Sequence, residues 1–163
     1  MQIIDAIGRS LQQVPVFADL SADYHQLVAG CGALSVFQSG ETIYREGAAA
    51  DSFYVIRRGR VRLEAHVPGR PPCIVDSLGA GDPLGWSWLV PPYRLQFDAK
   101  ALELTRLIRF DAACLRRKMA DDPRFACAIY ERLVPVIVGR LAEARRQLMD
   151  LYGQPAGRSQ AWR

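Results

Sequence analysis

Histidine is scarce in this sequence, which limits the chemistry that the chain can support. Of its two histidines, His25 lies in a helical segment and His66 near the end of a hairpin segment. Metal-dependent enzymes usually hold their ion with several clustered ligands, so we expect no metal site. The spacing also offers no Ser-His-Asp or paired-carboxylate arrangement, and we expect that the protein is not an enzyme.

Closely spaced cysteines are absent as well. The four cysteines form no CxxC pair and lie far apart in the sequence. Such spacing is typical of buried, reduced thiols in a cytosolic protein rather than of a disulfide framework. We therefore expect that the fold needs no disulfide at Cys31, Cys73, Cys114 or Cys127.

Long hydrophobic runs are also missing. The longest, Leu133 to Val138, is far too short to cross a bilayer, and the amphipathic start MQIIDAIGRSLQQV lacks the apolar region of a signal peptide. The net charge of +4 is modest, and a solvated helix face explains it more simply than a nucleic-acid surface does. We expect a cytoplasmic protein with no membrane association.

A chain of 163 residues is long enough for a single domain with one core. Residues 2–13 carry apolar side chains on one helical face, and Ser21 is placed to cap a second helix at 22–29. From 33 to 78, short apolar runs alternate with Gly or Asp turns, which predicts a double-sheet jelly roll or a related barrel. The turn glycines expected to have positive φ are Gly40, Gly47 and Gly59.

The segment from Gly79 to Asp111 organises the rest of the chain. Its first half places three glycines around a proline before a short apolar run, which predicts a strand, a tight turn and one helical turn. The first amides of a helix lack partners within the helix, so such a turn can bind a phosphate. The second half, from Leu95 to Phe110, predicts two strands. The sequence therefore predicts an anion cradle at 79–101 that lies against a sheet.

Helical sequence resumes at Asp111, which is expected to cap a helix at 112–120. The residues Asp121-Asp122-Pro123 then begin a longer helix, with proline suited to its first turn. Because Pro135 interrupts this helix, we expect a kink or a break near 132–135.

Two sets of side chains on this long helix have distinct expected roles. Arg140, Arg145 and Arg146 are expected on its outer faces, where they add solubility. An apolar stripe follows one face at Phe125, Ile129, Leu133, Ile137, Leu141, Ala144, Leu148 and Leu151. The first half of this stripe is expected to pack on the chain's own barrel.

Several motifs between residues 40 and 111 together resemble a known family. The segment GETIYREGAAADSFYVIRRGRVRL at 40–63, followed by GAGDPLGWSWL and TRLIRFD, resembles the cyclic-nucleotide-binding domain of the Crp/Fnr regulators and of cyclic-nucleotide-dependent kinases. The resemblance covers residues 12–150 and rests on the spacing of Gly40, Glu41, Glu46, Gly47, Asp51, Ser52, Gly59 and Val61. It implies a mainly β fold, an eight-stranded jelly roll (double-stranded β-helix) flanked by helices. The ligand would lie in a phosphate-binding cassette, and the long C-terminal helix would form a homodimer.

The implied layout divides the chain into four parts. These are N-terminal helices at 1–32, a jelly roll at 33–110, C-terminal helices at 111–152 and a polar tail at 153–163. No helix-turn-helix sequence follows the long helix, so we expect no specific DNA binding by this chain.

The cassette departs from the family pattern at two positions. The family has Gly-Glu at the start of the cassette, whereas here Gly85 is followed by Trp86. The family's phosphate-binding arginine falls on Leu95, so Arg94 would turn away from the pocket unless a bulge re-aims it. Loss of both contacts would weaken binding by about 10²- to 10⁴-fold. The candidate ligand-binding residues are Gly85, Trp86, Ser87, Trp88, Arg94 and Leu95.

Three functional interpretations remain open. The chain can be a stand-alone sensor that binds cyclic AMP, cyclic GMP or another anion and signals to an unknown protein partner. It can instead be a degenerate domain with a filled pocket that acts as a dimeric interaction module. These two differ in whether Arg94 and the amides after Gly85 face an open or a filled pocket. Trp86 and Trp88 either fill that pocket as core or stack on a planar ligand. A cupin-like enzyme is the weakest of the three.

Overall fold

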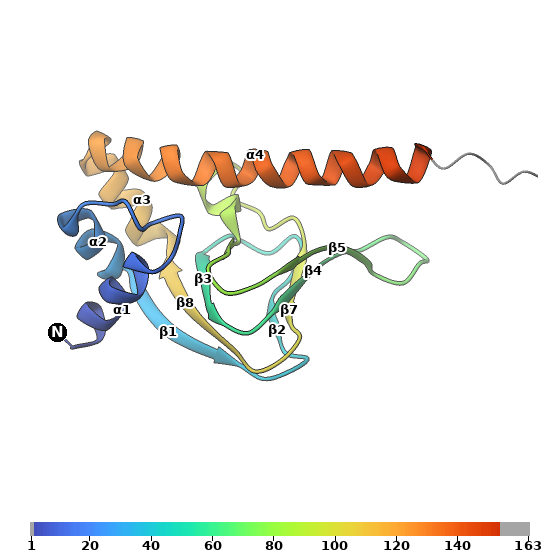
Figure 1. Ribbon diagram of the computed structural model, residues 1–163, viewed down its shortest axis with the longest axis horizontal. Helices are drawn as coiled ribbons and strands as arrows, with labels where there is room; N and C mark the ends of the chain where they lie inside the picture. The colour runs from blue at the N-terminus through green and yellow to red at the C-terminus, as the bar shows by residue number, and fades with distance from the viewer. Residues whose placement is uncertain (1, 154–163) are drawn as a thin grey trace, which may run out of the picture.

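The computed structural model describes residues 2–153, in which helices flank two β-sheets (Figure 1). The helices are α1 (Gln2–Gln12), α2 (Ala22–Ala29), α3 (Ala112–Asp121) and α4 (Pro123–Gly153), with a short 3₁₀ helix η1 (Trp86–Leu89). The strands are β1 (Gly32–Phe37), β2 (Thr42–Tyr44), β3 (Ser52–Arg58), β4 (Val61–Ala65), β5 (Cys73–Leu78), β6 (Pro83–Leu84), β7 (Asp98–Ala101) and β8 (Thr105–Asp111). Most of the tail predicted at 153–163 lies outside the described residues.

The described strands form two antiparallel sheets that pack face to face. The strand order is β1-β8-β3-β6 in the first sheet and β2-β7-β4-β5 in the second. An apolar core between the sheets includes Ile56, Leu63, Leu84, Ala99 and Leu107. This arrangement confirms the predicted mainly β jelly roll with a long C-terminal helix.

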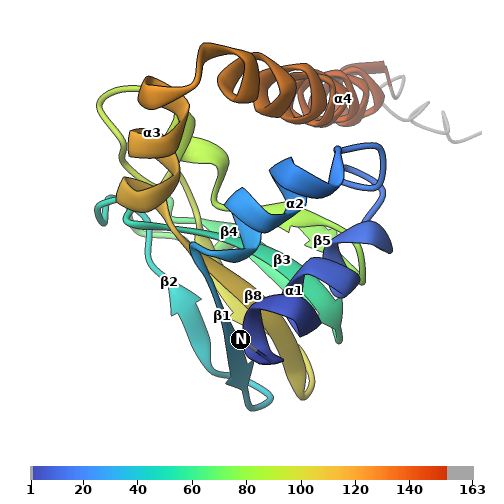
Figure 2. The same cartoon turned by 90° about the vertical axis from the view of Figure 1, so that its left-hand side faces the viewer.

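A second apolar core lies between the first sheet and the helices. Side chains alternate along β3 and β8, so Phe53 and Phe110 face the helices while Ile56 and Leu107 face the second sheet. Figure 2 shows α1 and α2 lying against this sheet, with α3 and α4 closing the same side. The helical residues in this core include Ile7, Leu11, Val28, Leu115, Phe125, Ile129 and Leu133. The first half of the α4 stripe therefore packs on its own domain, as expected.

The predicted caps and turns form as the local sequence indicates. The Ser21 side chain accepts a hydrogen bond from the Tyr24 amide at the start of α2, and Asp111 accepts one from Cys114 at the start of α3. Asp122 does the same for the Phe125 amide at the start of α4. The turn glycines Gly40, Gly47 and Gly59 all have positive φ. These predictions are confirmed. They could be made from the sequence because each depends on residues only a few positions apart.

The expectation that all four cysteines are buried thiols is wrong. Cys31 and Cys114 form a disulfide across 83 residues of sequence, and Cys73 and Cys127 are exposed. The pairing of β1 with β8 explains this proximity, because it places Gly32 opposite Phe110, directly before α3. Sequence spacing alone could not reveal a contact that depends on this strand pair.

The predicted break in the long helix is also wrong, because α4 continues through Pro135 without interruption (Figure 1). Pro135 is exposed, as is Glu131, whose carbonyl would have accepted the missing amide hydrogen bond. Water can satisfy that carbonyl, while Ile129 and Leu133 hold the preceding turns against the core. The helix therefore tolerates the proline and extends beyond the helical core toward the second sheet.

Candidate functional site

The turn before η1 requires glycine. Gly85 has φ +78, and a Cβ added there would lie 3.3 Å from the Ser52 carbonyl oxygen. It follows β6, which pairs with β3 through Leu84 and Tyr54. The chain then makes the single helical turn of η1, so the predicted strand, tight turn and helical turn are all present.

The two cassette tryptophans have different environments. Trp88 is 1% exposed and packs on Phe53, with ring centroids 5.7 Å apart, so the core interpretation holds for this residue. Its neighbour Ser87 is also buried. Trp86 is only partly buried and lines a cavity beside α4. Of these two tryptophans, Trp86 is therefore the one that reaches this cavity.

Arg94 lies outside this cavity. Its side chain is exposed, and its Nη1 donates a hydrogen bond of 3.4 Å to the Gly47 carbonyl. The next residue, Leu95, is 6% exposed and belongs to the core shared with the helices. Backbone pairing fixes this arrangement, because Leu95 donates to the Ala48 carbonyl and accepts from the Gly47 amide. The one-residue offset in the sequence is thus retained, with leucine inward and arginine outward.

The cavity beside α4 has a volume of about 290 Å³. Its walls come from β4, β5, the segment around η1 and β7, and the middle of α4. The apolar wall residues are Leu63, Val75, Trp86, Phe97, Ile137, Leu141 and Ala144, and the polar ones are Asp76, Gln96, Arg140, Glu143 and Gln147. Mostly apolar walls with a few polar groups are typical of sites for small molecules.

Arg140 supplies the cation of this cavity, which corrects the expectation that it lies on an outer face. Its Nη2 donates to the Pro83 carbonyl at β6, whereas its Nη1 is buried without a hydrogen-bond partner among the described residues. On α4 it follows Ile137 by three residues and precedes Ala144 by four, so all three share the face that meets the sheets. This i, i+3, i+7 spacing was the sequence signal that could have identified it.

The electrostatic surroundings of Arg140 are mixed. Burial lowers the pKa of its guanidinium, while the carboxylates of Asp76 and Asp82 act in the opposite direction. Nearby, burial raises the pKa of the Tyr44 hydroxyl and keeps it neutral. The unused donor of Arg140 can receive one anionic group, and Asp76 can accept hydrogen bonds from neutral donors on the same molecule.

The described residues contain neither a cluster of metal ligands nor a helix that could span a membrane. Between residues 2 and 153, no three His, Cys, Asp or Glu side chains gather in a way that could hold a metal ion. His25 is buried, with its Nε2 2.8 Å from the Phe17 carbonyl oxygen, while His66 is exposed near Glu46. Among the described helices, none combines the length and apolarity needed to cross a bilayer.

Known proteins resemble this chain in sequence. The family model for the cyclic nucleotide-binding domain matches residues 34–122. The nitrogen fixation regulation protein FixK of Azorhizobium caulinodans is 33% identical over 71% of this chain and 45% of its own length. The CRP-like cAMP-activated global transcriptional regulator of Mycobacterium tuberculosis is 28% identical over 71% of this chain and 50% of its own length. The chain thus spans about half the length of these curated relatives.

Solved structures resemble the fold. A cyclic nucleotide-binding domain from Methylobacillus flagellatus superimposes with a TM-score of 0.77 at 16% identity, covering 97% of this chain and 87% of that one. The sensor domain of the transcriptional regulator DNR from Pseudomonas aeruginosa does so with a TM-score of 0.68 at 19% identity, covering 98% and 99%. With the jelly roll, the turn at Gly85 and the match over 34–122, the chain belongs to the cyclic nucleotide-binding domain family, in the Crp/Fnr type.

Proposed function

We propose that this chain is a regulatory sensor module that binds a small planar ligand with one anionic group in the cavity beside α4. Arg140 would receive the anionic group and Trp86 would stack on the planar part. A cyclic nucleotide has this chemistry, since it joins one negative charge to an aromatic base. The ligand would sit against α4, and its binding would be passed to a protein partner through that helix.

The observation that carries the proposal is the buried Nη1 of Arg140, which has no hydrogen-bond partner among the described residues. A buried, unused donor of a charged group is costly, and an incoming anion would satisfy it. The two residues in which the cassette departs from its family are Trp86 and Leu95, and neither provides a charge. A cation from α4 in place of one from the cassette would compensate for that loss.

The exposed apolar face of α4 supports a role in dimer formation. Its exposed apolar side chains lie on one helical face, about 80° around the helix from the face that contacts the sheets. They are Tyr130, Val134, Val138, Leu141, Leu148, Met149 and Tyr152, each between 44% and 87% exposed. Leu141 belongs both to this exposed face and to the wall of the cavity. We infer a homodimer through this face, so that ligand and dimer would bias the same helix. The cytoplasmic location expected from the sequence stays a prediction.

Titration of the purified chain with cyclic AMP, cyclic GMP and cyclic dinucleotides, at fixed salt, tests the proposal. A ligand at a hundredfold excess over its Kd should raise the free energy of unfolding by about 2.7 kcal/mol. Arg140→Gln should weaken binding by about 10- to 100-fold, because a hydrogen bond to a charged group is lost. Arg94→Gln is the matched control, since it removes the same charge outside the cavity, and it should leave the Kd unchanged.

Two results would contradict this assignment. If Arg94→Gln weakened binding while Arg140→Gln did not, the anion would bind at the cassette edge and not beside α4. If no cyclic nucleotide bound at millimolar concentration, the degenerate interaction module would be the better interpretation. Leu95 and Trp88 favour that second function, because both side chains fill space as core within the cassette segment.

A further inference from the structure

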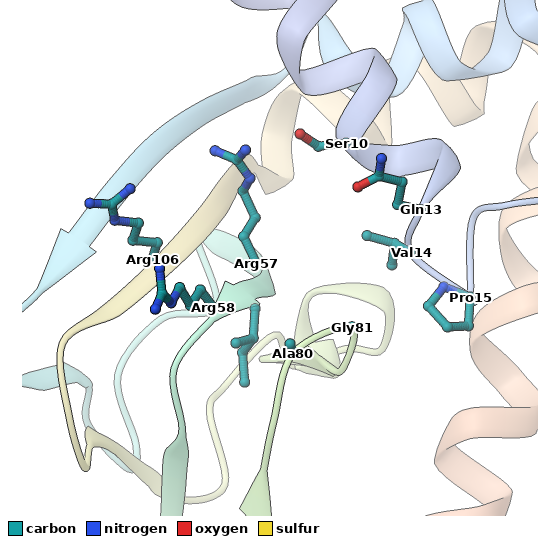
Figure 3. Close-up of a pocket in the computed structure, with 10 residues that line it drawn as sticks. Ser10, Gln13, Val14, Pro15, Arg57, Arg58, Ala80, Gly81 and Arg106 are labelled. Carbon is teal, nitrogen blue, oxygen red and sulfur yellow. The ribbon is translucent and has the colours of Figure 1, made fainter.

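A second and larger cavity lies between α1 and the ends of β3 and β8. Its volume is about 450 Å³, and it is separate from the cavity beside α4 because the two share no lining residue. Arg57, Arg58 and Arg106 line it, together with Ser10 of α1 and Gln13, which directly follows that helix (Figure 3). None of the residues that line it is acidic.

A break in strand register brings the three arginines together. The pairing of β3 with β8 shifts between Ile56 and Arg58, so Arg57 is an extra residue in β3 and Arg58 comes to lie opposite Arg106. In a regular strand Arg57 and Arg58 would point to opposite faces, whereas a bulge can direct both to one side. Figure 3 shows Arg57 extending from β3 toward Ser10 on α1, with Arg58 below it and Arg106 to its left.

The arrangement is electrostatically unfavourable on its own. Like charges directly opposite each other in an antiparallel pair destabilise the sheet. Within residues 2–153, no carboxylate forms an ion pair with Arg57, Arg58 or Arg106. A bound anion would convert this repulsion into attraction.

We infer that this cavity binds a soluble small molecule carrying two or more phosphate groups. Guanidinium groups match phosphate oxygens with paired hydrogen bonds, and three of them in one cavity suit more than one phosphate. The cavity volume lies within the usual range for small-molecule sites. The Gln13 amide can donate a further hydrogen bond to the ligand, and Ser10 Oγ, which already donates to the Ala6 carbonyl, can accept one.

Isothermal titration of the full chain with inorganic pyrophosphate and with orthophosphate, at matched ionic strength, tests the inference. Pyrophosphate should bind saturably and more tightly than orthophosphate. The double variant Arg58→Gln/Arg106→Gln should raise the Kd for pyrophosphate by at least about tenfold. Arg109→Gln removes an exposed arginine of the same strand outside the cavity and should change the Kd less than about twofold.

A stability measurement separates a binding role from a purely structural one. Without phosphate, the double variant should unfold at the same temperature as the wild type or a higher one, because the repulsion across the strand pair is removed. A lower unfolding temperature would overturn the inference that these arginines repel each other. Pyrophosphate should raise the unfolding temperature of the wild type and of Arg109→Gln, but not that of the double variant.

Three titration results would overturn the site itself. The first is that the wild type shows no saturable binding of pyrophosphate. The second is that Arg109→Gln loses as much affinity as the double variant Arg58→Gln/Arg106→Gln. The third is that Arg140→Gln abolishes pyrophosphate binding. The last variant alters only the cavity beside α4, so pyrophosphate binding should survive it. Failure of the cyclic-nucleotide titration would leave the expectation for pyrophosphate unchanged, and the two proposals are therefore tested separately.

Discussion

The exposed face of α4 leads to a prediction about assembly. Val138 and Leu148 are 57% and 53% exposed, and both lie on the face proposed to meet a second copy of the chain. Complete burial of such a side chain is worth about 1.5–3 kcal/mol, so burial of the exposed half is worth roughly half of that. Two residues in each of two protomers then contribute about 3–6 kcal/mol, or about 10²- to 10⁴-fold in the dimer Kd.

The double variant Val138→Glu/Leu148→Glu should therefore be a monomer at concentrations where the wild type is a dimer. Sedimentation equilibrium or light scattering after size-exclusion chromatography would measure both. Gly139→Glu is the matched control, because it adds a carboxylate on the opposite side of α4 and should leave the dimer intact. A wild type that is monomeric at about 100 μM, or a double variant that stays dimeric, would refute the assignment of this face.

Two further predictions concern stability and follow from single residues. A Cβ at Gly59 would lie 2.5 Å from Thr105 Oγ1 and 2.7 Å from Thr105 Cα, whereas one at Gly40 would have no neighbour within 4 Å. Both glycines have positive φ, which alanine adopts at a cost. Gly40→Ala should therefore lower the free energy of unfolding, measured in urea, by about 1 kcal/mol, and Gly59→Ala, which also clashes, by at least about 3 kcal/mol. Equal losses in the two variants would contradict the predicted clash at Gly59. Burial raises the pKa of Tyr44 in the folded state, so the folded protein holds this proton more tightly than the unfolded chain. The contribution of this proton to the free energy of unfolding is full below pH ~10 and is lost as the pH rises above that value. Tyr44→Phe should therefore make the unfolding temperature fall less steeply with pH above pH ~10. An unchanged slope would rule out this contribution of Tyr44.

Much of the fold could be read from the sequence because its signals are local. A cap such as Ser21 acts over three residues, a turn glycine such as Gly40 acts on its own φ, and strand alternation repeats every two residues. The spacing of the glycines and acidic residues between 40 and 61 added the family and its jelly roll. The one-residue offset between Arg94 and Leu95 also came from counting residues, whereas the packing of Leu95 in the core shared with the helices is visible only in the structure.

The candidate sites could be read only in part, because side chains from distant segments form them. Trp86 was identified from the cassette, but the sequence did not show that Trp88, two residues later, would be buried against Phe53. Arg140 lies more than fifty residues after Trp86, and only the path of α4 across the second sheet brings the two into one cavity. The disulfide at Cys31 depends in the same way on the pairing of β1 with β8.

The sequence by itself determined the caps, the turns, the family and the positions of most helices and strands, because these signals are carried by residues within short segments. It did not determine that α4 continues through Pro135, where Ile129 and Leu133 hold the preceding turns against the core. The tertiary structure alone decided which charges meet. It placed Arg140 inward against β6 and set Arg58 opposite Arg106 across two strands. The physical reason is that a cavity is bounded by elements whose separation in sequence says little about their separation in space.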